Sequence, residues 1–211
     1  MLSPTSFALV LALVSTTASA FDPGTPTTAS GRAFAVELGP AIAHAAVAYR
    51  PASEAAQALS AEIGRVELLL ILRDREHIRV ATTALIDHFA HAMDLLDVAR
   101  EAQTALADVD SRLHARGWGF GGRVFAHTAT PAERDEAIDL GELESKMVGD
   151  PEFKEVSVGV DGLVIGYMDT STRILSIVQR AKALLDGRTL PPRPPMTAEE
   201  RAALLNKISE L

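Results

Sequence analysis

The 211-residue sequence contains no cysteine. This absence excludes disulfide bonds, thiolate catalysis, iron–sulfur clusters and cysteine-ligated zinc sites. The stability of the fold must therefore come from the packing of apolar residues, which make up 47% of the chain. A chain of this length and composition fits one globular domain better than two.

Aromatic residues are also scarce, at 5% of the chain, whereas alanine is abundant. This balance favours closely packed helices over a sandwich of aromatic and β-branched strands. Lysine and arginine form no run, and the net charge is −8 with a sequence pI near 5.2. Because nucleic-acid binding needs a concentrated positive patch, the charge pattern argues against nucleic acid as a partner.

Motifs of catalysis and of nucleotide binding are missing as well. No G-x-S-x-G sequence is present, and the glycine-rich stretch at residues 117–122 matches neither the P-loop nor the dinucleotide-binding spacing. We therefore expect no nucleotide partner and a protein that is not an enzyme. A secreted enzyme with an active site dispersed along the chain is the alternative.

The first 20 residues have the pattern of a secretory signal. A short apolar run over residues 7–14 is followed by Ala18-Ser19-Ala20, the small-x-small pattern after which signal peptidases cut. The run is shorter than the roughly 20 apolar residues that span a bilayer. We therefore expect residues 1–20 to be a cleaved signal peptide rather than a retained anchor.

The residues at this cut resemble a plastid-targeting boundary. Ala18-Ser19-Ala20-Phe21 resembles the ASAF boundary of plastid preproteins from algae with secondary red plastids, in which Phe follows the signal cut. The resemblance implies a transit-like leader over residues 21–50, and residues 33–48 resemble a thylakoid-transfer signal. It thus implies a plastid location, with the thylakoid lumen as a candidate compartment. The alternative is a secreted or periplasmic protein with a flexible leader.

Apolar spacing predicts a helical domain over residues 51–190. One helix is expected from Ser53 to about Leu72, and a long helix from about residue 77 to residue 116. The glycines at 117–122 should end the long helix, and Thr130-Pro131-Ala132-Glu133 should start another that ends near Gly149. A further helix is expected from Asp169 or Thr170 to about Leu185. The long helix carries a nearly heptad stripe of Ile78, Leu85, Phe89, Ala92, Leu96, Ala99, Leu106 and Leu113.

A small β-hairpin is predicted at about residues 156–167. Asp161-Gly162 is the usual dipeptide of a two-residue hairpin turn, and apolar residues alternate on both sides of it. The alternating residues are Val156, Val158, Val160, Leu163, Ile165 and Tyr167. The predicted fold class is therefore mainly α, a helical bundle with one long helix, this hairpin and a C-terminal helix.

The C-terminal helix is expected after a proline-rich spacer. Residues 191–196 favour an extended polyproline conformation, and Thr197-Ala198-Glu199-Glu200 forms a capping box that opens a helix over residues 197–211. This helix is amphipathic, and we interpret it as a docking helix for a partner. The alternative is a helix that folds back to close its own bundle. Its candidate partner-binding residues are Leu204, Leu205 and Ile208.

Two further candidate sites lie on or next to the long helix. His88 and His91 are three residues apart and so share a face, where they could ligate a divalent metal or a chlorophyll magnesium. Trp118 lies between Arg116 and Arg123 in the glycine-rich stretch and is a candidate anchor for a partner surface, since Trp and Arg dominate binding hot spots. The alternative for Trp118 is a side chain that closes the end of the core.

Together these features indicate a non-catalytic accessory or assembly subunit of a larger protein complex, for which a membrane-associated photosynthetic complex is the candidate. In size and composition the chain resembles the small helical extrinsic subunits of photosystems, of the Q type of photosystem II. The resemblance implies a partner complex at a thylakoid membrane. The alternatives are a metal- or pigment-binding protein that uses His88 and His91, and the secreted enzyme.

Overall fold

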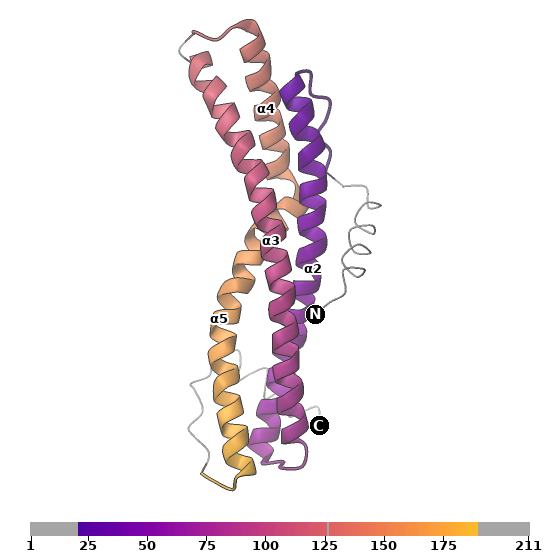
Figure 1. Ribbon diagram of the computed structural model, residues 1–211, viewed down its shortest axis with the longest axis vertical. Helices are drawn as coiled ribbons and strands as arrows, with labels where there is room; N and C mark the ends of the chain where they lie inside the picture. Colours follow the sequence, from indigo (N-terminus) through magenta and orange to yellow (C-terminus); the bar gives the residue numbers. More distant parts are fainter. Residues whose placement is uncertain (1–20, 126, 190–211) are drawn as a thin grey trace. The chain divides into compact units, whose positions relative to one another are not determined.

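The computed structural model describes residues 21–125 and 127–189. These residues form four helices, α2 (Ala29–Leu72), α3 (Ile78–Phe125), α4 (Pro131–Gly149) and α5 (Pro151–Leu185) (Figure 1). Within the described ranges no residue belongs to a strand. The prediction of a mainly helical bundle with one long helix is confirmed, and α3 has 48 residues.

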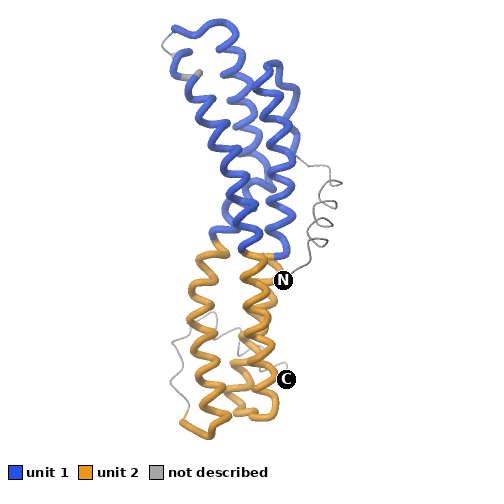
Figure 2. The backbone as a smooth tube through the Cα atoms, viewed as in Figure 1, with its two compact units in different colours: residues 1–51, 97–161 blue, residues 52–96, 162–211 orange. Residues whose placement is uncertain are grey.

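The chain divides into two compact units, coloured separately in Figure 2. The described residues 21–51 together with Asp97–Asp161 form unit 1, and Ala52–Leu96 together with residues 162–189 form unit 2. Helices α2, α3 and α5 each contribute one segment to each unit, whereas α4 belongs to unit 1 alone. Unit 1 therefore packs four helical segments, and unit 2 packs three.

The core of unit 1 is built from apolar residues that recur every three or four positions, the spacing that places them on one side of a helix. Helix α4 begins with the predicted capping box, in which the Thr130 hydroxyl accepts a hydrogen bond from the Glu133 backbone N–H and the Glu133 carboxylate accepts one from the Thr130 backbone N–H. The Asp150 carboxylate caps α5 by accepting from the Phe153 N–H. The largest fully buried side chains are Leu38, Ile42, Leu113, Leu140, Leu143 and Met147.

The core of unit 2 lies between the second half of α2, the first half of α3 and the second half of α5. The turn between α2 and α3 is fixed by Asp74, whose carboxylate accepts from the backbone N–H groups of Glu76 and His77. The Arg75 guanidinium donates to the Leu184 carbonyl at 2.7 and 2.9 Å, and this carbonyl at the end of α5 also accepts from the Gly187 N–H at 3.2 Å. Fully buried side chains are Leu59, Val66, Leu70, Ile78, Leu85 and Ile177.

The predicted hairpin is wrong, because residues 156–167 are part of α5. The apolar residues of this segment also satisfy a helical spacing, and Val156, Val160 and Tyr167 are buried in that register. An apolar residue at every second position is compatible with a strand, and some of these residues also recur at helical spacing. The structure has them in the 35-residue helix α5.

The glycine-rich stretch also differs from expectation, because α3 does not end there but continues to Phe125. The apolar stripe predicted for α3 is confirmed, and every member except the partly exposed Phe89 is buried.

Helix α2 begins at Ala29, so most of the expected transit-like leader is helical. Leu38 and Ile42 from this leader lie in the core of unit 1. The signal segment, the proline-rich spacer and the C-terminal helix lie outside the described residues.

Candidate functional site

The candidate site is a stripe of exposed apolar side chains on α5 in unit 2. Ile165, Met168 and Leu175 are 66%, 69% and 60% exposed. They are spaced by three and seven residues, which places them on one side of the helix. We call these three residues the apolar face.

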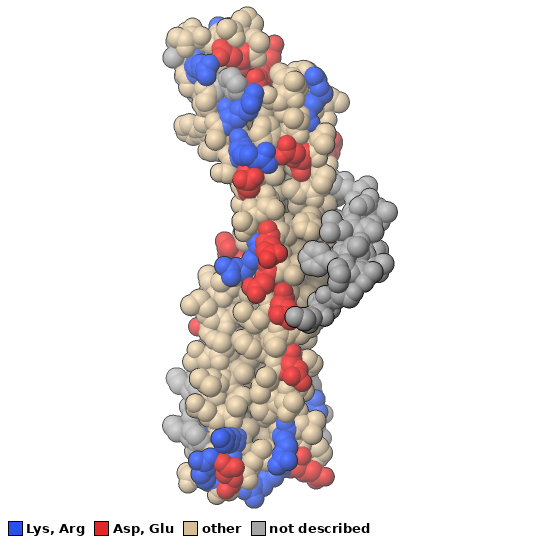
Figure 3. All heavy atoms as spheres, viewed as in Figure 1, with Lys and Arg blue, Asp and Glu red and all other residues tan. Residues whose placement is uncertain are grey.

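Few charged residues lie near this side of α5. Between Gly162 and Ala181 the helix has three charged residues, of which Asp169 lies one turn after Ile165 and borders the apolar face, whereas Arg173 and Arg180 lie farther round the helix. Figure 3 shows an extended surface without Lys, Arg, Asp or Glu over this part of α5 and the neighbouring part of α3. The charged side chains of unit 2 gather instead at the end that holds the α2–α3 turn.

Helix α3 continues the apolar surface. The ring of Phe89 lies 6.2 Å from the ring of Tyr167, so the flank of α3 that carries Phe89 packs against α5. Ile86 precedes Phe89 by one turn on that flank and is exposed. Soluble proteins seldom leave contiguous apolar side chains in water without a binding role, whereas single exposed apolar residues need no explanation.

A shallow groove lies between α2 and α5 in the same unit. Its volume is about 150 Å³, below the roughly 300–1,000 Å³ of pockets that hold small-molecule ligands. Gly162 and Gly166 line it, and a Cβ at either position would meet no atom within 4 Å. The groove is lined by Ala56, Leu59, Ser60, Ile63, Gly162, Leu163, Gly166, Tyr167, Thr170 and Arg173.

The polar groups of this groove include an ion pair and a buried phenol. Arg173 donates from Nε and Nη2 to the buried carboxylate of Glu67, at 3.2 and 3.0 Å. Burial raises the pKa of Tyr167, so its phenol stays protonated at neutral pH, and the hydroxyl is buried without a hydrogen-bond partner. A buried neutral phenol and a paired carboxylate give no general base facing open space.

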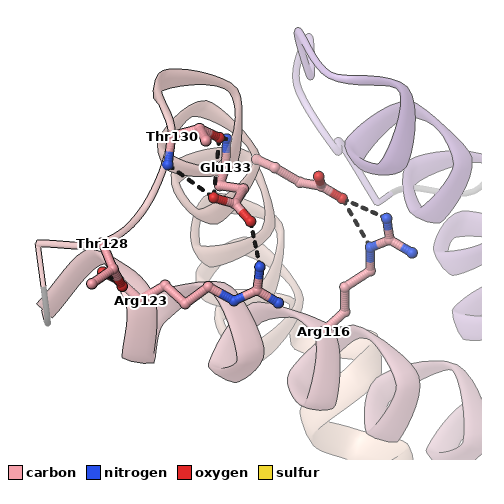
Figure 4. Close-up of polar contacts among 6 residues, drawn as sticks. Arg116, Arg123, Thr128, Thr130 and Glu133 are labelled. Carbon is pink, nitrogen blue, oxygen red and sulfur yellow. Dashed lines mark hydrogen bonds and ion pairs between the residues drawn. The ribbon is translucent and has the colours of Figure 1, made fainter.

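Two acids of α4 in unit 1 form ion pairs with arginines of α3 (Figure 4). Arg123 of α3 pairs with Glu133 of α4, and Arg116 pairs with Glu136 at 2.8 Å. Hydrogen bonds from the backbone and side chain of Thr130 lower the pKa of Glu133, because they stabilise its ionised form. These contacts bind α3 to the first turns of α4.

Trp118 is exposed, as its role as a partner anchor requires. Its side chain is 70% exposed on α3 in unit 1, and its ring lies 5.6 Å from that of His114. His114 in turn contacts Glu144 of α4 at 2.7 Å, and burial together with the Glu144 charge raises the pKa of Asp110. The alternative, in which Trp118 closes the end of the core, does not fit this exposure.

The other predicted site residues meet different outcomes. His88 and His91 are both exposed on α3 in unit 2. Across residues 21–125 and 127–189 no group of three or more His, Asp and Glu side chains is placed to hold a metal ion, so a metal site at this pair stays a prediction. Leu204, Leu205 and Ile208 lie outside the described residues.

Comparisons of the chain with known protein families, with curated proteins and with solved structures give no match. Among the described helices, none combines the length and the apolar content required for a bilayer crossing.

Sequence reasoning missed the apolar face. The predicted hairpin places Ile165 in a strand that ends at Tyr167 and so separates it from Met168 and Leu175. The signal was present, since residues 165, 168, 172 and 175 follow a helical spacing and none of them is charged.

Proposed function

We propose that the protein is a non-catalytic helical accessory or assembly subunit that binds a protein partner through the apolar face. The observation that supports this proposal is the exposure of Ile165, Met168 and Leu175 on one side of α5. Fully burying a side chain of this size contributes about 1.5–3 kcal/mol, so three of them can anchor a partner helix. Trp118 of unit 1 is a second candidate contact.

The proposed setting is a plastid complex at a thylakoid membrane. It draws on the targeting-like residues 18–21 and on the resemblance to extrinsic photosystem subunits. We propose binding rather than catalysis because Glu133 and His114 are engaged in contacts between α3 and α4. His88 and His91 are exposed, and among the described residues no third side chain joins them as a metal ligand.

Site-specific photo-crosslinking tests the proposal. A photoreactive amino acid replaces Met168, and a matched chain carries it at Val80, an exposed apolar residue of unit 2 outside the apolar face. Both chains are incubated with an extract of the source organism, and the adducts are identified by mass spectrometry. We expect one dominant adduct from position 168 that is absent from position 80.

The triple variant Ile165→Ser/Met168→Ser/Leu175→Ser provides the control for affinity. Because all three residues are exposed, the variant should fold, and circular dichroism verifies its helix content. We expect it to lose the captured partner, whereas Val80→Ser retains it. Equal capture by both variants would contradict the proposal, as would turnover of a substrate by the purified chain.

A further inference from the structure

The apolar face is a position where one more helix would complete a bundle. Unit 1 packs four helical segments, whereas the described part of unit 2 packs three and leaves the apolar face uncovered. A helix laid along this side would bury the three apolar residues, and the one acid close to them, Asp169, would lie at the edge of the contact, where it can stay in water.

The chain itself continues from a point beside this face. Helix α5 ends at Leu185, and Gly187 has a φ of +72°, the left-handed conformation that ends a helix and turns the chain. The Arg188 N–H donates to the Ala183 carbonyl at 2.8 Å, and Arg75 holds the Leu184 carbonyl. The chain therefore turns away from the axis of α5 at Gly187.

The remaining residues are long enough to return along α5. A proline-rich spacer over residues 191–196 reaches about 19 Å when extended, and a helix over residues 197–211 adds about 22 Å. Counted back from Leu185, Leu175 lies about 15 Å and Ile165 about 30 Å along the axis. The spacer and the helix together span the whole apolar face.

The sequence of the C-terminal segment matches the face in chemistry. Leu204, Ile208 and Leu211 are spaced by four and three residues, so a helix presents them on one side together with Leu205. Arg201 falls on the same side, one turn before Leu204, whereas Glu199, Asn206 and Glu210 fall on the other side. Because the apolar face consists of apolar side chains, it matches the leucine side of such a helix better than the other side.

We infer that residues 197–211 dock on the apolar face of their own chain and occupy the site that the partner uses. Tethering gives the segment a millimolar effective concentration, so docking needs only modest intrinsic affinity. A partner must then displace the segment, which makes the C-terminal helix an intramolecular competitor. This regulatory consequence rests on the proposed function, whereas docking itself does not.

The absence of native cysteine makes a thiol-protection experiment direct. Met168→Cys places a single thiol on the apolar face of the full-length chain, and Val80→Cys places one at an exposed position outside it. Each is combined with Leu204→Glu/Ile208→Glu, which puts charge on the apolar side of the segment. The matched control is Ala202→Glu/Ser209→Glu, which puts the same charge on its polar side. Alkylation rates by iodoacetamide are measured on purified protein at several concentrations.

We expect the thiol at position 168 to react at least about fivefold more slowly than the thiol at position 80, because a docked segment must open before the reagent enters. Leu204→Glu/Ile208→Glu should remove this protection, and Ala202→Glu/Ser209→Glu should leave it in place. Equal rates at both positions, or protection that ignores the tail variants, would overturn the inference. Protection that grows with protein concentration would assign the face to a second copy and would also overturn it.

The outcome for the partner is independent of this result. Partner capture by photo-crosslinking at position 168 can succeed where the thiol is unprotected, and protection can be found in a chain that captures no partner. If both hold, the Leu204→Glu/Ile208→Glu variant should capture more partner than the intact chain. The two proposals can therefore fail separately.

Discussion

At the scale of single residues, Asp139 connects two helices through one carboxylate. It is buried on α4, and it accepts a hydrogen bond of 2.6 Å from the Thr28 backbone N–H and bonds of 3.3 Å from the Thr27 hydroxyl. Thr28 immediately precedes α2, whose first N–H groups have no partner within the helix. The Thr28 hydroxyl caps α2 by accepting from the Gly31 N–H at 3.1 Å, and Asp139 holds this cap in place from a distant part of the sequence.

We predict that Asp139→Ala lowers the free energy of unfolding by about 1–2 kcal/mol, the usual cost of a lost cap. Burial alone would raise the pKa of Asp139, but the hydrogen bonds from Thr28 and Thr27 outweigh it and hold the pKa below the ordinary 3.8. The carboxylate therefore adds stability above pH 3.8, and this stability is lost as the pH falls through the lower folded pKa.

Urea unfolding of both proteins between pH 7 and pH 2 measures the effect. The difference between the native chain and Asp139→Ala should be full at pH 7 and should shrink in acid. The matched control is Asp135→Ala, an exposed acid on the same helix, which should change stability little. A difference that stays constant down to pH 2 would contradict the assignment of the charge to the cap.

A second prediction concerns the glycines of α5. Gly162 and Gly166 lie inside the helix with open space around them, so Gly162→Ala and Gly166→Ala should each raise stability by about 0.5–1 kcal/mol. Gly31 of α2 provides the contrast, because its added Cβ would lie 2.8 Å from the Pro26 Cβ and 2.9 Å from Asp139 Oδ2. Gly31→Ala should therefore destabilise, and thermal melting of the three variants compares the signs.

At the scale of helices, the Glu67–Arg173 pair fixes α5 against α2 in unit 2. Glu67 is buried, and Arg173 donates to it from two nitrogens. We predict that Arg173→Met lowers the free energy of unfolding by about 2–3 kcal/mol, because it leaves a buried carboxylate without this partner. The double variant Glu67→Met/Arg173→Met should recover most of the loss. Denaturant unfolding of all four proteins gives the coupling energy, and simple additivity would contradict a buried ion pair.

Helical periodicity in the sequence predicted most of the fold. The predictions were wrong where the sequence was compatible with two local structures. The stripe of α3 and the capping box of α4 were predicted, since both depend on residues near each other in the chain. The Asp161-Gly162 dipeptide favours a hairpin turn locally, but Val156, Val160 and Tyr167 bury their side chains only along a continuous helix. Tertiary packing, which the sequence does not display, decided the outcome.

The glycine-rich stretch of α3 shows the same limit. Its glycines lower helix propensity by about 1 kcal/mol each, yet α3 continues through them to Phe125. Arg116 and Arg123 lie on either side of Gly117 and Gly122 and are bound to Glu136 and Glu133 of α4. The sequence places those partners 20 and 10 residues away, so the ion pairs that hold this end of the helix were not predictable from it.

The candidate site could be predicted only in part, because exposure is a property of the folded molecule. Trp118 was singled out by its residue type, and its exposure agrees with that choice. The apolar face has no motif, and its three residues differ from core residues of α5 such as Tyr167 and Ile177 only in the side of the helix they occupy. Once the helix is known, their shared side follows from numbering alone.

At the scale of the whole molecule, the two units share three helices rather than a linker. Helix α2 passes from unit 1 to unit 2 after Pro51, α3 between Leu96 and Asp97, and α5 between Asp161 and Gly162. Pro51 lies inside α2 and removes one backbone hydrogen bond there. No exposed connection between separately folded parts is present in the described ranges, because each crossing lies within a helix.

This arrangement predicts a single cooperative unfolding transition. Unfolding unit 2 alone would break α2, α3 and α5 in their interiors and would leave new helix ends without caps in unit 1, each costing about 0.5–2 kcal/mol. Asp139→Ala in unit 1 and Arg173→Met in unit 2 should therefore both shift the same melting transition. Far-ultraviolet circular dichroism follows all helices, and the fluorescence of Trp118 follows unit 1 alone, since it is the single tryptophan of the chain. The two signals should give one midpoint in every variant. If Arg173→Met lowered the dichroism midpoint and left the tryptophan midpoint unchanged, unit 2 would be unfolding by itself, and the continuous helices would not couple the two cores.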